Sequence, residues 1–220
     1  MAVHGADPHW GETLLFIQPM AGDAGVIDRT GRHRPALNEY AAVTSHGRWD
    51  GHAAVALDGY GDYVSVPASA ALHLGGGAFT IEWMGRLNTL VRTRCLIAHW
   101  TFLRWEASAF SLRVDQGVPT LCIPFGQTMV RVAAEVPVEA GVPLYVAATG
   151  DGAGGVRLWV NGTPAGAATL PGPLNVCPSP LTIGVEAETE FYLDGEVHAV
   201  RITRGTARGI GPRTNPFPCG

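Results

Sequence analysis

Three glutamates at alternating positions, Glu186, Glu188 and Glu190, are the residues whose spacing most suggests catalysis. On an extended strand, side chains at i, i+2 and i+4 point to the same face, so these carboxylates would share one surface. Two carboxyl groups on one face can cleave a glycosidic bond, one as the acid and the other as nucleophile or base. The trio, however, falls in a connection between two predicted strands and not on a sheet face. We therefore interpret it as a solvated acidic loop and predict no catalytic residue and no enzymatic activity.

Binding a sugar without catalysis requires exposed aromatic side chains on loops with polar neighbours. Four residues meet this description and are the candidates for glycan contact: Trp49, Tyr60, Trp100 and Trp105. Trp100 has a second interpretation, partial burial beneath a loop, which we favour.

A local basic cluster, Arg29, Arg32, His33 and Arg34, lies in a stretch with no regular pattern. Guanidinium groups in an irregular loop can contact an acidic partner surface or an anionic glycan. A solvated loop is the alternative.

Histidine and cysteine spacing gives no transition-metal site. The eight histidines form no H-x-H or H-E-x-x-H pattern, and the four cysteines form no C-x-x-C pattern. Cys95 and Cys122 fall inside predicted strands, which favours small core residues. A Cys177–Cys219 disulfide stays open as an alternative, although synthesis in a reducing cytosol disfavours it.

The residues above must be positioned by β-strands, and the organising strand is the segment 190–205. Its apolar side chains keep one alternating phase up to Ala199 and take the opposite phase from Val200 onward. A strand that is apolar on both faces is buried between layers. We predict one long strand in the middle of a sheet, with a bend or bulge at Asp194-Gly195.

Earlier segments alternate between strand-like runs and turns rich in glycine or proline, a pattern typical of an all-β sandwich. The predicted strands are residues 13–18, 53–57, 63–67, 79–87, 94–102, 109–115, 120–125, 128–136, 143–149, 155–160 and 181–184. Residues 19–52 look irregular, and residues 68–74 form a short turn. Asn161-Gly162 is the strongest hairpin signal, since both positions of a type I′ turn require φ > 0.

Composition limits the functional classes. The chain has 220 residues, a net charge of −4 and 15 basic residues, all of them arginine. A chain of this charge is not expected to bind nucleic acid. The first residues have no apolar run typical of a signal peptide, and no stretch approaches the ~18 apolar residues needed to span a membrane.

The run G-x-V-x-x-V-R-I-T-R-G-x-A-R, residues 195–208, resembles the closing strand of concanavalin A-like, laminin-G-like jelly-roll domains. Its end, RITRGTAR, is similar to the version found in bacteriophage virion proteins. Residues 55–87 and 144–166 match in the same order, so the resemblance spans residues 13–208. It implies one antiparallel β-sandwich of the concanavalin A-like type over residues 1–220.

The resemblance also implies positions for calcium, because many relatives bind one Ca²⁺ through loop carboxylates. Asp28, Asp58 and Asp62 lie where relatives often carry acidic residues. The chain departs from that pattern at residues 18–19 and 198–199, which lack the expected carboxylates. A Ca²⁺ site needs six to eight oxygens, so we expect it to be weak or absent, with no other cofactor.

We interpret the chain as a non-enzymatic structural protein of a bacteriophage virion, made in the host cytoplasm and attached to capsid or tail subunits within a homo- or hetero-oligomeric assembly. It would also offer a lectin-like face to host surface glycans. A free carbohydrate-binding protein is the alternative, and a glycoside hydrolase of the same fold is the third.

The C-terminal segment, residues 206–220, contains arginines and prolines but no acidic residue, and Phe217 gives it one large apolar anchor. Proline favours an extended course. The segment either lies on the sandwich itself or docks on a partner, in which case deleting residues 209–220 would leave the domain folded but prevent its incorporation into particles. The candidates for partner docking are Arg29, Arg32, Arg34, Arg208, Arg213 and Phe217.

Overall fold

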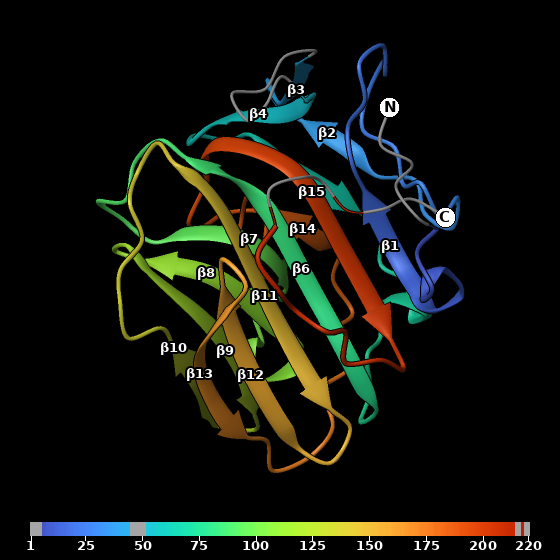
Figure 1. The fold of residues 1–220 in the computed structure, drawn as a ribbon, viewed down its shortest axis with the longest axis vertical. Helices are drawn as coiled ribbons and strands as arrows, with labels where there is room; N and C mark the ends of the chain where they lie inside the picture. The colour runs from blue at the N-terminus through green and yellow to red at the C-terminus, as the bar shows by residue number, and fades with distance from the viewer. Residues whose placement is uncertain (1–5, 45–51, 214–216, 218–220) are drawn as a thin grey trace.

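The structure, a computed structural model, describes residues 6–44, 52–213 and 217, and its strands form two antiparallel sheets packed face to face (Figure 1). The 8-stranded sheet has the order β13-β12-β11-β6-β15-β4-β3, with β1 also paired to β15. The 7-stranded sheet has the order β10-β9-β8-β7-β14-β5-β2. The prediction of an all-β antiparallel sandwich is confirmed.

The strands of the 8-stranded sheet are β1 (Thr13–Ile17), β3 (Ala42–Thr44), β4 (Ala54–Asp58), β6 (Ala78–Leu87), β11 (Pro143–Asp151), β12 (Gly155–Val160), β13 (Thr163–Thr169) and β15 (Asp194–Arg204). Those of the 7-stranded sheet are β2 (Ala36–Asn38), β5 (Tyr63–Val66), β7 (Arg94–His99), β8 (Phe110–Asp115), β9 (Val118–Phe125), β10 (Thr128–Ala133) and β14 (Leu181–Ile183). Short 3-10 helices are η1 (Trp10–Glu12), η2 (Ala70–Leu72) and η3 (Trp105–Ala107).

Strand β15 lies in the middle of its sheet, as predicted. It pairs with β6 along its length, with β4 through its first half and with β1 through its second half. The predicted bulge position was wrong, because Asp194 and Gly195 pair regularly with Asp58 and Leu57. The irregularity against β6 falls between Val197 and Ala199. One extra residue there reverses the alternation.

This bulge explains the change of phase along β15. Val197, Val200 and Ile202 all belong to the core between the sheets, whereas Ala199 faces a second cluster on the outer side of the 8-stranded sheet. Both faces of the strand are therefore buried. The main core is filled by large side chains such as Trp83 and Phe110, each contributing ~1.5–3 kcal/mol through burial.

The outer face of the 8-stranded sheet is covered by the two ends of the described chain (Figure 1). Phe217 is 2% exposed and packs on Phe16 and Tyr145, with ring centroids 6.3 and 5.9 Å away. Trp10 packs edge-on against Phe16 from the other side. The first alternative for the C-terminal segment is thus the one observed, because Phe217 lies on the sandwich itself.

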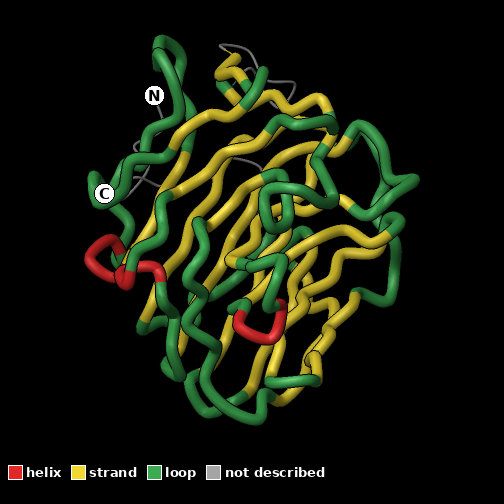
Figure 2. Tube along the Cα trace, turned by 180° about the vertical axis from the view of Figure 1, so that it is seen from behind, coloured by secondary structure: helices red, strands yellow, loops and turns green. Residues whose placement is uncertain are grey.

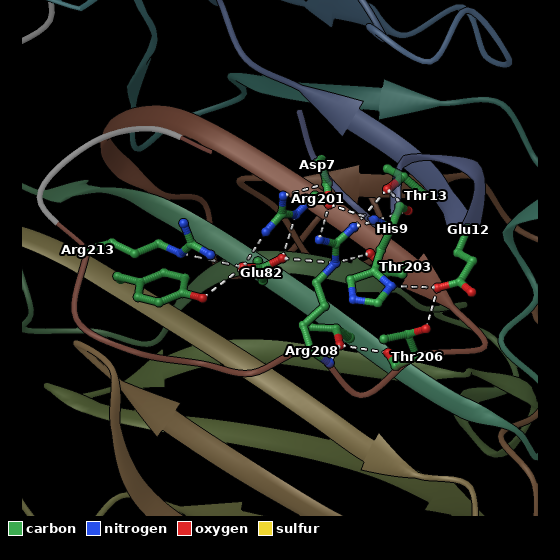
Figure 3. A network of polar contacts seen from close by, with 12 residues as sticks. Asp7, His9, Glu12, Thr13, Glu82, Arg201, Thr203, Thr206, Arg208 and Arg213 are labelled. Carbon is green, nitrogen blue, oxygen red and sulfur yellow. Dashed lines mark hydrogen bonds and ion pairs between the residues drawn. The ribbon is translucent and has the colours of Figure 1, made fainter. Parts of the chain in front are cut away.

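A buried ionic network joins the same two ends, as Figure 3 shows. Glu82 on β6 accepts hydrogen bonds from Arg201 Nε at 2.6 Å and Nη2 at 2.9 Å, and from the Tyr145 hydroxyl at 2.8 Å. Asp7 accepts from Arg201 Nη1 at 3.0 Å and from Arg208 Nη1 at 2.7 Å. Each buried charge thereby has a partner, the condition under which such a network is tolerated.

The hairpin predicted at Asn161-Gly162 joins β12 to β13, with φ values of 49° and 82°. These positive values match a type I′ turn. A Cβ on Gly162 would lie 2.1 Å from the backbone nitrogen of Pro212, so the C-terminal segment also crosses this turn.

Two short strands were missed within the stretch predicted as irregular. Strand β2 pairs with β5, and β3 pairs with β4. Strands of three residues carry too little alternation to be recognised. No helix among the described residues is long and apolar enough to cross a membrane.

Candidate functional site

Three loops meet around a hollow of about 500 Å³ lined mainly by tyrosines and glutamates. The β2–β3 connection and the segment before β15 each contribute one tyrosine and one glutamate. The β4–β5 turn, together with the first residue of β5, contributes two tyrosines and a glycine. The lining residues are Glu39, Tyr40, Tyr60, Gly61, Tyr63, Glu188 and Tyr192.

Two of the rings stand in solvent. Tyr40 is 84% exposed and Tyr60 is 83% exposed, whereas Tyr63 and Tyr192 are half-buried. Exposed rings of this kind have apolar surface that a folded chain ordinarily covers, and a tyrosine keeps a hydroxyl for hydrogen bonding. The hollow therefore combines apolar faces with polar tips.

Asp62 holds two of these loops together. Its Oδ1 accepts a hydrogen bond from Tyr40 N at 2.8 Å, and its Oδ2 accepts one from Asp58 N at 3.1 Å. Asp58 Oδ1 in turn accepts from Tyr60 N at 2.7 Å, so the tip of the turn is fixed. The φ values of Gly59 and Gly61 are 86° and 80°, which glycine adopts without strain.

The backbone around the hollow is strained. Glu39, Ala187, Glu188 and Phe191 have φ values of 53°, 52°, 62° and 59°, and they are four of the six non-glycine residues with positive φ in the described chain. The left-handed conformation costs roughly 1–2 kcal/mol for each such residue. Strain of this kind persists where surrounding contacts impose it and clusters at functional sites.

Glu186 supplies one of those contacts. It closes a tight loop with Glu190 through backbone bonds of 2.8 and 3.0 Å, and its carboxylate accepts a hydrogen bond from the Ser111 hydroxyl and lies 3.5 Å from Arg113 Nη1. Burial raises the pKa of Glu186, and Ser111 and Arg113 oppose that rise. The loop is thus anchored to β8 at its first residue.

Phe191 anchors the other end of the loop. It packs with Ala187 against a cluster on the outer face of the 7-stranded sheet, below the Arg113 guanidinium at 5.3 Å, and its carbonyl accepts from Cys95 N at 2.8 Å. Figure 2 shows loop segments passing over this face of the sheet. Between the two anchors the exposed Glu188 is presented to the hollow.

The hollow is electronegative. Burial raises the pKa of Tyr63 and of Tyr192, and the nearby charges of Glu188 and Glu39 raise both further. The Glu39 and Glu188 carboxylates have no hydrogen bond or ion pair within the described part of the chain. Chemically, the site offers four tyrosine rings and two unpaired acceptor groups.

Of the four residues predicted for glycan contact, the structure places one, Tyr60, in the hollow. Trp100 is only 7% exposed and Trp105 is half-buried against the same outer-face cluster, so neither lines this site. Burial beneath a loop, the favoured interpretation for Trp100, is what the structure shows. Trp49 lies outside the described residues.

Five of the six carboxylate oxygens of the three aspartates considered for calcium accept hydrogen bonds from the protein. Asp28 accepts from the backbone nitrogens of Phe16, Thr30 and His33. Asp58 and Asp62 bind backbone nitrogens in the loops of the hollow. Within the described ranges, no group of three or more His, Cys, Asp or Glu residues is arranged to hold a metal ion.

Most of the arginines proposed for partner docking are used within the chain. Arg29 binds the Gln18 carbonyl and Asp23, and Arg32 binds the carbonyls of Thr13 and Gly11. Arg34 is exposed.

The C-terminal docking candidates are also in contact with the sandwich. Arg208 is 8% exposed and Phe217 is 2% exposed. The Arg213 guanidinium lies over the rings of Tyr145 and Phe217 at 5.7 and 5.2 Å. Arg208 and Phe217 therefore offer little surface to a partner.

The prediction of a solvated loop at the glutamate trio was wrong for Glu186, which is 3% exposed. Glu188 and Glu190 are exposed, as predicted. Cys95 and Cys122 are buried core residues as predicted, and Cys177 is buried too. Cys219 lies outside the described residues, so the structure says nothing of the Cys177–Cys219 pairing.

Sequence reasoning missed Glu39, Tyr40, Tyr63 and Tyr192 as site residues. The available signal was the density of tyrosines beside turn residues. Tyr40 follows Asn38-Glu39, and Tyr60 lies within Asp58-Gly59-Tyr60-Gly61. Nothing local shows that these turns meet the segment before β15.

A two-layer jelly-roll sandwich with an aromatic hollow formed by its loops belongs to the class of lectin-like β-sandwiches. The chain is a member of the concanavalin A-like lectin/glucanases superfamily, whose laminin-G-type family model matches residues 58–207. No curated protein matches the chain in sequence.

Solved structures with the same architecture include the receptor-binding domain of botulinum neurotoxin D, with a TM-score of 0.68 and 9% identity over 93% of this chain and 51% of that one. The binding domain of botulinum neurotoxin serotype C1 has a TM-score of 0.69 and 12% identity over 91% of this chain and 50% of that one. The binding domain of Paraclostridial Mosquitocidal Protein 1 has a TM-score of 0.64 and 12% identity over 93% of this chain and 50% of that one. This chain spans about half the length of these neighbours, and the likeness shows the fold alone.

Proposed function

We propose that the protein is a non-catalytic binding module that recognises glycans in the tyrosine-lined hollow, and that it is carried on a bacteriophage virion. The observation that carries the binding role is the pair of solvent-exposed rings, Tyr40 and Tyr60, above two half-buried tyrosines and two carboxylates. Sugar rings stack their C–H faces on aromatic side chains, and their hydroxyls donate to carboxylates. The superfamily includes lectins by its description, and the structural neighbours are named as binding domains.

The virion part of the proposal is supported by the resemblance of residues 201–208, RITRGTAR, to the closing strand of phage virion proteins. Arg32 and Arg34 are both exposed, but Arg32 donates to the carbonyls of Thr13 and Gly11, so within such a particle Arg34 would be the member of the basic cluster that contacts an acidic neighbour. Particles that contain the chain at a fixed number of copies, measured by quantitative mass spectrometry, would support this location. A chain found only free in the lysate would indicate a free carbohydrate-binding protein instead.

Glycan-array binding by the purified chain tests the binding role. We expect saturable binding that Tyr60→Ala or Tyr40→Ala weakens by tenfold or more, taking as the scale for one lost stacked ring the ~1–3 kcal/mol found for nucleobases stacked on aromatic side chains. Phe102→Ala is the matched control, because Phe102 is an exposed ring, 60% accessible, that does not line the hollow.

Three results would contradict the binding role. Binding that is unaffected by both tyrosine variants would place the ligand elsewhere on the surface. An array with no saturable binding would leave the hollow without a sugar ligand. Turnover of a polysaccharide that Glu188→Gln abolishes would make the chain a glycoside hydrolase, with an exposed carboxylate of the hollow taking part in the reaction.

A further inference from the structure

The charges around the hollow are unevenly distributed. Its lining contains two carboxylates, Glu39 and Glu188, and no basic side chain. Both residues have positive φ, a conformation that glutamate rarely adopts by itself. The surrounding loops therefore impose the backbone conformation from which these two carboxylates project. An acidic lining repels carboxylated and sulfated sugars, because like charges placed close together raise the free energy of the complex.

A guanidinium beside the β4–β5 turn does not neutralise this lining. Arg94 lies behind the β4–β5 turn, where its Nη1 donates to the Tyr192 carbonyl at 2.7 Å and its Nη2 donates to the Thr89 hydroxyl at 2.6 Å. A Cβ on Gly59 would lie 3.5 Å from Arg94 Nη1, so the guanidinium packs against the β4–β5 turn at Gly59. Arg94 thus supports the backbone of the site and forms no ion pair with Glu39 or Glu188.

Three aspartates that border these loops accept hydrogen bonds from the protein itself. Asp58 and Asp62 accept backbone N–H groups, and Asp194 accepts from the side chains of Asn88 and Thr89. Two acceptor groups therefore remain free among four tyrosine rings. Rings attract a cation over their faces, and carboxylates accept strong, charge-assisted hydrogen bonds from an ammonium group.

We propose that the hollow selects glycans that carry free amino groups, such as oligomers of glucosamine, over the corresponding neutral or acidic sugars. This inference rests on the proposed glycan-binding function and adds the charge class of the ligand. The sugar ring would stack on Tyr40 or Tyr60, while its protonated amine would bind Glu39 or Glu188. An N-acetyl group at the same position is neutral and removes the ammonium donor.

A matched pair of ligands tests the charge class. Calorimetric titration at about pH 5.5, where amines are protonated, would compare glucosamine oligomers with N-acetylglucosamine oligomers of the same length. We expect about tenfold tighter binding of the amine form, a preference of about 1.4 kcal/mol. The preference should shrink at high salt, because ions screen exposed charges.

Variants locate the effect. Glu188→Gln and Glu39→Gln keep the size of the side chain and remove its charge, so each should weaken binding of the amine oligomer several-fold more than it weakens binding of the acetylated oligomer. Glu135→Gln is the control, since Glu135 is an exposed glutamate outside the hollow. Thermal unfolding of each variant would verify that the fold is intact.

The outcomes separate this inference from the proposed function. Equal affinity for the two oligomers, or tighter binding of the acetylated one, would overturn the selection for amines while leaving the hollow a glycan site. Failure of every glycan to bind would overturn both. Tighter binding of an oligolysine of equal charge would overturn the amine-glycan proposal in favour of a basic peptide.

Discussion

Arg208 Nη1 lies 2.7 Å from Asp7 Oδ1, so a side chain that follows the last strand binds one that precedes the first. The other oxygen of Asp7 accepts from Arg201 at the centre of β15. Burial alone would raise the pKa of Asp7, yet the hydrogen bond from Arg208 and the charge of Arg201 bring it below its usual value. The carboxylate is therefore ionised and shared by two buried guanidinium groups.

Replacing this carboxylate should be costly. Asp7→Ala would leave Arg201 and Arg208 with uncompensated buried charge, and we expect the free energy of unfolding to fall by about 3–5 kcal/mol. Urea unfolding followed by tryptophan fluorescence would measure it. Arg131→Ala is the comparison, because its pair with Asp115 is 52% exposed on the arginine side and should be worth under ~1 kcal/mol. Equal effects of the two substitutions would contradict the role given to Asp7.

Phe217 should contribute to stability as a core residue does. Phe217→Ala removes a ring packed on Phe16 and Tyr145, and we expect a loss of about 3 kcal/mol or more in urea unfolding. Phe102→Ala, at a ring that is 60% exposed, should cost far less. The same reasoning predicts that deleting residues 209–220 destabilises the isolated domain, contrary to what the partner-docking alternative implied. Unchanged stability of both Phe217→Ala and the truncated chain would show that the tail adds nothing to the fold.

Gly162 is predicted to tolerate no side chain. Gly162→Val would place a branched residue at a φ of 82° and bring its Cβ 2.1 Å from Pro212 N. We expect a loss of more than ~1 kcal/mol, from the left-handed backbone and from displacement of the tail. Gly172→Val is the matched control, since a Cβ on Gly172 would meet no atom within 4 Å. Equal melting temperatures for the two variants would mean that this turn has another geometry.

Acid should destabilise the protein through His99. This residue is 1% exposed, its Nε2 lies 3.1 Å from the Ser179 carbonyl, and burial lowers its pKa from 6.5 to about 4. The unfolded chain therefore binds the proton first, so stability is full above pH 6.5 and falls as the pH drops toward 4. The loss over that range is on the order of 3 kcal/mol.

His99→Gln tests this assignment by comparing unfolding free energies at several pH values. Other buried groups also titrate in this window, so the informative quantity is the difference between the wild type and the variant. That difference should shrink as the pH falls below 6.5, because the variant has no imidazole to protonate. A difference that stays constant with pH would assign the acid sensitivity to other groups.

Chelators are expected to change thermal stability little. Both oxygens of Asp28 and of Asp62, and Oδ1 of Asp58, already accept backbone N–H groups, which leaves few lone pairs for a Ca²⁺ ion. Differential scanning fluorimetry with and without EGTA would measure the effect, and added magnesium would control for ionic strength. A fall in melting temperature greater than about 5 °C would reveal a bound structural ion.

The fold was predictable from sequence because its signals are local. Asn161-Gly162 specifies a turn through the φ angles that its two residues tolerate, and the alternation along residues 190–205 identifies a strand buried on both faces. The position of the bulge was not predictable in the same way. The alternation of apolar side chains reverses near Ala199, and either a bend earlier in the strand or an extra residue at that point would produce this reversal. Only the register of β15 against β6 decides between the two.

The site was less predictable because its residues come from turns that are distant in sequence. Tyr60 was identified from its exposed turn, but Glu39 and Glu188 meet it through pairing of β2 with β5 and of β4 with β15. Glu186 was misjudged for the same reason. Its anchor, Ser111, lies 75 residues away in the chain, and no feature of the acidic loop indicates it.

The central place of β15 governs the order in which this protein can fold. Because β6, β4 and β1 each pair with β15, the 8-stranded sheet consists of three unconnected parts until the ribosome has released residues 194–204: β13-β12-β11-β6, β4-β3, and β1. Before then, β6 presents a ten-residue edge with unpaired backbone groups on the side that β15 will occupy. Such an edge can pair with another chain, and contacts between residues so far apart form slowly. We therefore expect the yield of folded domain to depend strongly on the rate of synthesis and on chaperones that bind unfolded chains, more than the stability of the folded domain alone would suggest.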